Sequence, residues 1–369
     1  MTTPPSIPPA GAVLDRADLR GRVHATLAAF LTRQGERLAA IDPVALAPVL
    51  EAARVLLLGS GKRLRPAFAY WGYRGAGGAD SPHRADVIAA VSSLELVQAS
   101  ALIHDDVMDG SDTRRGEPAA HRRFAALHRA DGWRGDPEAF GTAAAILLGD
   151  LCLVWSDEML HGSGVEPAAL ARARTVFDEM RSEVTVGQYL DVRAQAAGDS
   201  SVRRATLVAR YKSAKYTVER PLLLGAALAG AGDDVRAAYS GYGLPLGEAF
   251  QLRDDVLGVF GDPAVTGKPA GDDLREGKRT VLVALTLEHA GPSAVALFDK
   301  LLGVHDLDET GVDDLRATIT SSGAPDRIEK MIRELGASAR ASLRSTSELT
   351  GEGRAALDAL IDVSTARSA

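Results

Sequence analysis

The chain has 369 residues, of which 46 % are hydrophobic and 25 % charged, and its formal net charge is −7. This length can hold one large domain or two ordinary ones, and the apolar content is ample for a sizeable core. The acidic balance argues against a nucleic-acid partner. Cys152 is the only cysteine. An intrachain disulfide is therefore excluded, and a reducing compartment such as the cytoplasm fits.

The first nine residues contain four prolines and have neither the positive start nor the apolar segment of a signal peptide. We therefore expect residues 1–14 to form a disordered leader and residues 15–369 to form a single all-α domain. The longest apolar run, residues 142–155, is interrupted by Gly149-Asp150. It is shorter than the roughly 20 residues that a membrane span needs. We expect a buried helix there, and we do not expect an integral membrane protein.

Apolar residues recur at helical spacing through most of the chain, and no run alternates as a strand would. Glycine-rich breaks separate these periodic segments, and none of them has the length of an interdomain linker. Helices are expected at about 15–41, 43–58, 64–75, 83–109, 119–130, 138–162, 166–197, 201–230, 234–260, 278–290, 292–303, 308–321, 325–348 and 351–364.

A basic segment, Gly61-Lys62-Arg63-Leu64-Arg65-Pro66, opens the third expected helix. It could be misread as a nucleotide-binding P-loop. That motif requires a glycine five positions before Gly61 and a Ser or Thr after the lysine, and Leu56 and Arg63 occupy those places. The segment therefore indicates another kind of anion site, or a solvated basic helix start.

The helix expected at 83–109 carries an apolar stripe that ends in a carboxylate. Its members are separated by three or four residues and so share one face. A polar end above an apolar wall suits a substrate with a charged head and a hydrocarbon tail, although an ordinary core stripe explains the lower part equally well. The stripe consists of Val87, Val91, Leu94, Gln98, Ala101 and Asp105.

Asp105 and Asp109 lie four residues apart, so their Cβ atoms would be about 6 Å apart on one helix face. Asp106 lies beside them, and Arg114 and Arg115 follow. Crowded carboxylates repel one another unless a cation intervenes, and oxygen-only ligands favour Mg²⁺. Arginines bind phosphate oxygens in pairs of hydrogen bonds. The pattern indicates a magnesium–phosphate site, with an acidic helix end as the alternative.

A second acidic pair, Asp254 and Asp255, lies in an otherwise apolar helical segment one turn after Gln251. Its apolar neighbours make a freely solvated face improbable on physical grounds. We expect the two acidic segments to form facing walls of one cavity that holds several metal ions.

Together these motifs resemble the trans-type isoprenyl diphosphate synthases, or polyprenyl synthetases, and most closely their geranylgeranyl diphosphate synthases. The resemblance runs from about residue 30 to about residue 350. It implies an orthogonal helical bundle of the isoprenoid synthase type around a central cavity, and a homodimer. Besides the two acidic motifs, its landmarks are the basic segment 61–66, Gly187-Gln188-Tyr189-Leu190-Asp191, Lys212-Ser213 and the interval from Lys268 to Lys278.

The resemblance also implies residue roles. Isopentenyl diphosphate would be held by Lys62, Arg65, Gln98 and Arg115. Three Mg²⁺ ions would be held by Asp105, Asp109 and Asp254, with Asp106 and Asp255 completing the acidic motifs. The allylic diphosphate would further contact Arg114, Lys212, Ser213, Gln251, Lys268 and Lys278. The catalytic group would be Asp105, Asp109, Lys212, Asp254 and Lys268.

The chain departs from the family pattern in two places. Gly258 stands where the second motif usually has a third acidic residue. Lys212 is followed by Ser213 in place of threonine, and Lys215 lies close enough in sequence to compete for the same role. Gln188 and Asp191 are equally compatible with helix-to-helix hydrogen bonds and with substrate contact.

The expected reaction is a Mg²⁺-dependent head-to-tail condensation of isopentenyl diphosphate with dimethylallyl, geranyl or farnesyl diphosphate. A class I terpene cyclase would lack the second diphosphate site. A non-catalytic partner subunit usually lacks the first acidic motif, and a plain helical interaction protein needs no paired aspartate clusters.

Chain length is expected to depend on the side chains below Asp105. In the resembled family, aromatic residues four or five places before this aspartate stop growth at fifteen carbons or fewer. Here those places hold Ala101 and Ser100, with Val97 about two turns below Asp105. We expect geranylgeranyl diphosphate as the product, with a product of 25 carbons or more, or farnesyl diphosphate, as alternatives.

Overall fold

The computed structural model describes residues 18–59, 61–79, 85–262, 271–304 and 306–365. Within these ranges the fold is all-α, apart from one two-stranded antiparallel hairpin of β1 (Thr113–Arg114) and β2 (Glu117–Pro118). The leader expected at 1–14 lies outside the described residues, and the division into a single domain stays a prediction.

The longer helices are α2 (Leu19–Ile41), α3 (Ala47–Leu58), α4 (Leu64–Gly75), α5 (Ala85–Asp109), α6 (Ala120–Ala130), α7 (Pro137–His161), α8 (Pro167–Ala197), α10 (Arg220–Ala229), α11 (Asp233–Phe260), α15 (Pro292–Leu301), α16 (Glu309–Ser321), α17 (Ala324–Arg344) and α18 (Gly351–Thr365).

Most of the expected helices are confirmed within a few residues, but three details differ. The segment expected as one helix at 201–230 is continuous, yet its middle is a π-helix, η1 (Ala209–Glu219), between α9 (Val202–Val208) and α10. A short helix, α13 (Asp272–Arg275), precedes α14 (Val281–Glu288) and was not expected. The β1–β2 hairpin was also missed, because two-residue strands have no periodicity to detect.

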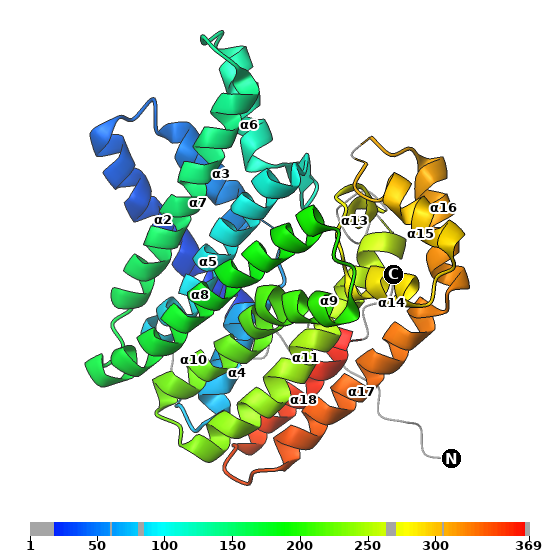
Figure 1. Cartoon of the computed structure of the whole chain (residues 1–369). Coiled ribbons are helices and arrows are strands. Elements are labelled where there is room, and N and C mark those ends of the chain that lie inside the picture. The colour runs from blue at the N-terminus through cyan, green and yellow to red at the C-terminus, as the bar shows by residue number, and fades with distance from the viewer. Residues whose placement is uncertain (1–17, 60, 80–84, 263–270, 305, 366–369) are drawn as a thin grey trace, which may run out of the picture.

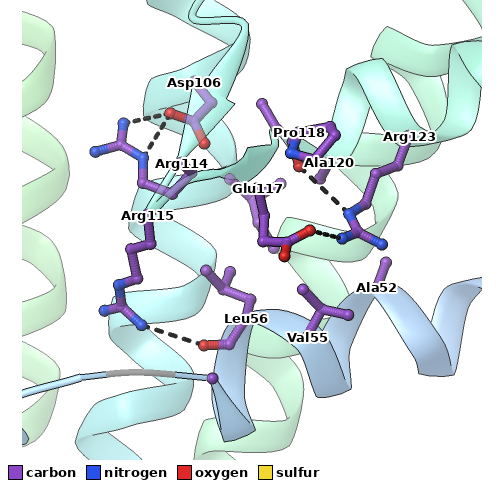
Figure 2. Close-up of a pocket in the computed structure, with 13 residues that line it drawn as sticks. Ala52, Val55, Leu56, Asp106, Arg114, Arg115, Glu117, Pro118, Ala120 and Arg123 are labelled. Carbon is purple, nitrogen blue, oxygen red and sulfur yellow. Dashed lines mark hydrogen bonds and ion pairs between the residues drawn. The ribbon is translucent and has the colours of Figure 1, made fainter. Parts of the chain in front are cut away.

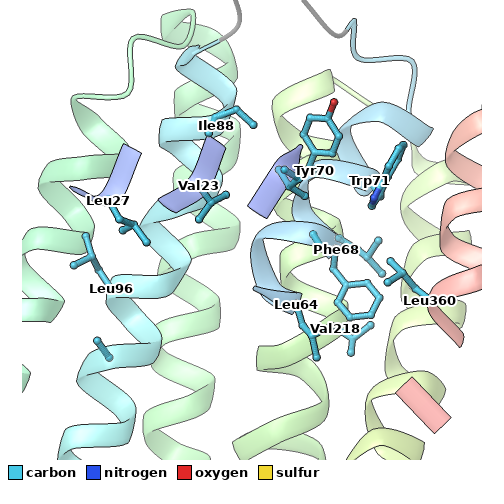
Figure 3. Close-up of a cluster of buried hydrophobic side chains, with 14 of the residues drawn as sticks. Val23, Leu27, Leu64, Phe68, Tyr70, Trp71, Ile88, Leu96, Val218 and Leu360 are labelled. Carbon is cyan, nitrogen blue, oxygen red and sulfur yellow. The ribbon is translucent and has the colours of Figure 1, made fainter. Parts of the chain in front are cut away.

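The main core surrounds α5, which runs through the molecule with α2, α4 and α7 packed against it (Figure 1). Leu96 of α5 lies beside Leu27 of α2, and Phe68 of α4 lies beside Val218 and Leu360 in the same core (Figure 3). Because α5 is held on several sides, the carboxylates at its C-terminal end are carried by a rigid element.

A second core lies at the C-terminal side of the molecule, where α13 to α16 gather at the upper right of Figure 1. Leu274 of α13 is fully buried there with Phe298 of α15 and Val312 of α16. This anchorage places the residues around α13 against the C-terminal half of α11, which carries the second acidic motif.

Glycines allow two helices to approach η1 closely. A Cβ atom on Gly187 of α8 would lie 2.3 Å from the backbone nitrogen of Lys212, and one on Gly247 of α11 would lie 2.5 Å from the carbonyl oxygen of Ala214. Such distances are shorter than any ordinary contact, so only glycine fits. π-Helical turns often occur at functional sites, and here the π-helix presents Lys212 to α8 and α5.

We expect Gly187→Ala to lower the free energy of unfolding by about 1–3 kcal/mol, the usual range for overpacking. It should also lower activity, because α8 and η1 must move apart. Gly351→Ala is the matched control, since a Cβ there meets nothing within 4 Å. Thermal unfolding and turnover are measured for both, and equal behaviour of the two variants would contradict the packing argument.

The two helices long and apolar enough to cross a membrane, among the described residues, are α5 and α7. The helix expected at 138–162 is confirmed as α7, which continues through Gly149-Asp150 over 25 residues. The expectation that it is buried holds only in part. α5 is a core helix, with 72 % of its apolar window buried, whereas only 39 % of the α7 window is buried. Cys152 and Trp155 point into the core, while Leu147 and Val154 are exposed.

Candidate active site

Asp105 lies at the meeting point of three helices. Its carboxylate accepts hydrogen bonds from Gln188 Nε2 of α8 and from Lys212 Nζ of η1, each at 3.0 Å. Arg114 Nη2 lies 3.7 Å from its second oxygen. Lys212 Nζ also donates to Asp191 of α8 at 2.7 Å. The Gln188 and Asp191 side chains therefore make helix-to-helix hydrogen bonds that hold Asp105 and Lys212 in place.

Asp106 points to another side of α5. It is buried and accepts two hydrogen bonds from Arg114, one from Nε at 2.8 Å. This pair borders a cavity of about 330 Å³ between α3, α5, the hairpin and α6 (Figure 2). Figure 2 shows Arg123 turned toward Glu117 on the far side of that cavity. The geometry sets Asp106 apart from Asp105 and makes it a partner of Arg114.

Lys278 joins the first acidic motif to the residues around α13. Its ammonium nitrogen lies 3.4 Å from Asp109 Oδ2 and 3.3 Å from Asp273 Oδ1, and it also pairs with Glu276. Burial would lower the pKa of Lys278, but the charges of these three carboxylates outweigh it and raise the pKa well above the usual value. Lys278 therefore stays charged at any physiological pH.

The third acidic place of the second motif is filled from another element. A Cβ atom on Gly258 would lie 1.9 Å from Asp273 Oδ2. The carboxylate of Asp273 thus occupies the space that a side chain at position 258 would take. Position 258 therefore has no room for a side chain, and the acidic group in this space is Asp273 of α13.

The two aspartates of the second motif have different surroundings. Asp254 is half-buried, whereas Asp255 is buried and accepts a hydrogen bond of 2.7 Å from Gln251 Nε2. Burial raises the pKa of Asp255 to about 7, with the Gln251 hydrogen bond opposing and the charges of Asp273 and Asp254 adding. Asp254 is therefore the aspartate of this motif that is accessible to a ligand.

The pKa values of Asp105 and Asp109, the two aspartates of the first motif, shift in opposite directions. Burial acts to raise the pKa of Asp105, but Lys212, Lys278 and Arg114 outweigh it and hold the pKa well below the usual range. Burial and the charge of Asp105 raise the pKa of Asp109 to about 6, against the opposing effect of the two lysines. The site therefore carries negative charge that the two ammonium groups neutralise only in part.

We expect Asp255→Asn to stabilise the metal-free protein at pH 8. A carboxyl whose pKa is raised on folding destabilises the fold fully above its folded pKa, here about 7, and not at all below its unfolded pKa of 3.8. The gain in melting temperature should therefore shrink as the pH falls from 7 to 4. A loss of stability that is equal at pH 8 and pH 4 would contradict this account.

The basic residues of the 61–66 segment and the hairpin lie together. Arg65 donates to Thr217 Oγ1 at 2.9 Å, and its guanidinium lies 4.1 Å from the centre of the Tyr216 ring. Arg115 donates to the carbonyl oxygen of Leu56. Burial and the neighbouring guanidinium groups lower the pKa of Arg115, against the opposing charge of Glu95. Such a concentration of positive charge favours an anion.

The two lysines of η1 have different partners. Lys215 pairs with Glu183 of α8 at 2.5 Å and lies near Glu219 at 3.8 Å. Lys212 faces Asp105. Ser213 is half-buried beside it. Lys268, expected to bind the allylic diphosphate, lies outside the described residues.

Only some side chains of the stripe below Asp105 are exposed. Ala101 and Gln98 are partly exposed, on the face of α5 that carries Asp105. Ser100 and Val97 are buried, and Leu94 is fully so. Of the residues expected to set chain length, Ala101 is thus the most exposed.

Sequence reasoning missed several residues of this region. Glu95 could have been noticed as a charge within an apolar run, but Tyr216, Asp273 and Glu276 carry no such signal. Their positions depend on contacts between segments that are distant in the chain, such as the 2.7 Å hydrogen bond from Ser111 to Glu276.

The comparisons with known proteins agree with this geometry. Residues 47–319 match the family model of the polyprenyl synthetases. A geranylfarnesyl diphosphate synthase of Aeropyrum pernix is 33 % identical over 83 % of this chain and 90 % of its own. A geranylgeranyl diphosphate synthase of Methanosarcina mazei is 32 % identical over 76 % and 78 %.

A crystal structure of the geranylgeranyl pyrophosphate synthase of Corynebacterium glutamicum, complexed with isoprenyl diphosphate and magnesium, superposes with a TM-score of 0.91. The two sequences are 42 % identical, over 95 % of this chain and 99 % of that one. The chain belongs to the polyprenyl synthetase family. It has the isoprenoid synthase fold and is a trans-prenyl diphosphate synthase, a transferase of isoprenoid biosynthesis.

Proposed function

We propose that the protein condenses isopentenyl diphosphate with an allylic diphosphate to give geranylgeranyl diphosphate, with three Mg²⁺ ions in its active site. The observation that carries this proposal is the pairing of an acidic site at Asp105 and Asp109 with a separate basic site at Arg65 and Arg115. A condensation needs two diphosphate sites, one with metal and one without.

The chemistry of the carboxylates suits magnesium, because carboxylate oxygens are the ligands that Mg²⁺ prefers. Asp109 Oδ2 is buried without a hydrogen bond and is neutralised by the ion pair with Lys278 at 3.4 Å. The described residues contain no preformed cluster of three or more metal ligands, so binding would draw Asp105 and Asp109 together. Asp105, Asp109 and Asp254 would hold the ions, whereas Asp106 and Asp255 are engaged by Arg114 and Gln251. Bound Mg²⁺ would neutralise charge on the departing diphosphate. Lys212, Lys278 and Arg114 would also neutralise charge on this diphosphate.

The chain's own groups would act on the substrates as follows. Lys212 and Lys278 would turn from the aspartates to the allylic diphosphate once metal replaces them as the neutralising charge. Lys62, Arg65 and Arg115 would hold isopentenyl diphosphate with its double bond toward the allylic carbon. Exclusion of water protects the allylic cation from being quenched.

We expect Arg65→Ala and Lys62→Ala to raise the KM for isopentenyl diphosphate roughly tenfold or more, because each removes a charge-assisted contact. The KM for the allylic substrate should change far less. Steady-state kinetics with each substrate varied in turn measures both. Equal weakening of the two substrates would place these residues outside the isopentenyl site.

A homodimer is supported by α7. This helix exposes Ile146, Leu147 and Val154, at 42 %, 67 % and 63 %, along one side. Exposed apolar strips of this kind commonly mark protein–protein contacts. Light scattering in solution distinguishes a dimer from a monomer of 38.7 kDa. We place the protein in the cytoplasm, in keeping with its single buried thiol.

The product assignment is tested by incubating the enzyme with labelled isopentenyl diphosphate and each of dimethylallyl, geranyl and farnesyl diphosphate. The expected product has twenty carbons, and a product of 15 or 25 carbons would replace this assignment. A terpene cyclase would instead form hydrocarbon or alcohol from an allylic diphosphate alone. Omitting isopentenyl diphosphate therefore separates the two activities.

A further inference from the structure

The most deeply buried ion pair near the basic site joins Arg63 to Glu95. Arg63 Nη1 lies 2.5 Å from Glu95 Oε2, and the two side chains are only 5 % and 3 % exposed. The other end of the Arg63 guanidinium donates to the carbonyl oxygens of Leu57, at 2.5 Å, and Gly59, at 3.3 Å. One side chain thus ties the end of α3 to the middle of α5.

This pair coincides with an unfavourable backbone conformation. Arg63 has a φ of 52°, in the left-handed region that non-glycine residues rarely adopt. Such a residue persists only where its surroundings over-determine it. Here the three acceptors of its guanidinium do so. The backbone reversal turns Arg63 inward while Lys62, on one side, is exposed and Arg65, on the other, is half-buried.

Glu95 also acts on the other basic groups. It is the acid that opposes the lowering of the Arg115 pKa by its surroundings. Beside its paired oxygen, Glu95 Oε1 is buried without a hydrogen-bond partner, as are Arg65 Nε and the Tyr216 hydroxyl. The buried carboxylate therefore lies beneath the very cations that form the proposed isopentenyl site.

We propose that Glu95 is a positioning residue for isopentenyl diphosphate. Through Arg63 it holds the 61–65 segment in the one backbone conformation that presents Lys62 and Arg65 to the diphosphate. This inference rests on the proposed role of those two residues. Arg63 is accordingly a structural arginine within the basic motif, and it does not touch substrate.

The test uses Glu95→Gln, which keeps the shape of the side chain but removes its charge, and Arg63→Lys, which keeps the charge but cannot reach three acceptors. We expect each to raise the KM for isopentenyl diphosphate about tenfold or more. The turnover number and the KM for the allylic substrate should stay within about threefold. Calorimetric titration with isopentenyl diphosphate alone should show the same weakening without turnover.

A double variant, Arg63→Met with Glu95→Gln, distinguishes positioning from mere stability. Removing both charges should recover melting temperature, because a buried charge is no longer left unpaired, yet the raised KM should remain. The matched control is Asp358→Asn, which breaks the ion pair between α18 and Arg340 of α17. It should affect stability without a selective rise in this KM.

An unchanged KM for isopentenyl diphosphate in Glu95→Gln, or a rise shared equally by both substrates, would overturn the inference. Recovery of the KM in the double variant would do the same, since the role of the pair would then be structural only. Lys62→Ala and Arg65→Ala are run in parallel. If they too leave this KM unchanged, the proposed isopentenyl site itself is wrong.

Discussion

Replacing Asp105 by alanine is expected to lower turnover by about 10²–10³-fold or more, the usual loss when a group that stabilises charge in the transition state is removed. Asp105 is the carboxylate that Lys212 and Gln188 hold in place, and its pKa is lowered by the cations around it. It is therefore ionised and ready to bind metal at any physiological pH. Its removal takes away a proposed Mg²⁺ ligand directly beside the departing diphosphate.

The fold should survive this substitution, because Lys212 retains Asp191 as its partner. Asp112→Ala is the matched control, since Asp112 is an exposed aspartate that pairs with Arg122. Turnover at saturating Mg²⁺, melting temperature and Mn²⁺ binding followed by electron paramagnetic resonance are measured for both variants. Rates near those of the wild type for Asp105→Ala would remove Asp105 from the proposed set of metal ligands.

Replacing Ala101 by phenylalanine is expected to shift the product to fifteen carbons or fewer. Ala101 lies one helical turn below Asp105 and is partly exposed, so we propose that it borders the path of a chain anchored at the acidic site. A phenylalanine ring there would fill that path after a few isoprene units. Because the ring lies below the metal site, the first condensation should proceed at a rate comparable to that of the wild type.

A graded series makes this prediction sharper. Ala101→Val and Ala101→Leu should give intermediate distributions, measured by chromatography of the dephosphorylated products. Ser100→Phe should shorten the product as well, but at some cost in stability, because Ser100 is buried. If all these variants make the wild-type product at comparable rates, the growing chain follows a different face of the cavity.

The sequence alone was sufficient for features that depend on neighbours in the chain. Helical periodicity located most of the long helices, and the four-residue spacing of Asp105 and Asp109 put both on one face of α5. The same local logic excluded a P-loop at Gly61. It could not detect the π-helical geometry of η1, because a wider turn leaves the apolar pattern almost unchanged.

Tertiary packing alone decided which partners chemically equivalent residues have. Lys212 and Lys215 are three residues apart, but Lys212 meets Asp105 and Lys215 meets Glu183. The acid that fills the space beside Gly258 comes from α13, and Arg63 is turned inward by Glu95. These contacts join residues that lie from 15 to more than 100 positions apart in the chain. Their energies depend on distance and burial, which no local pattern encodes, so only the assembled helices could determine them.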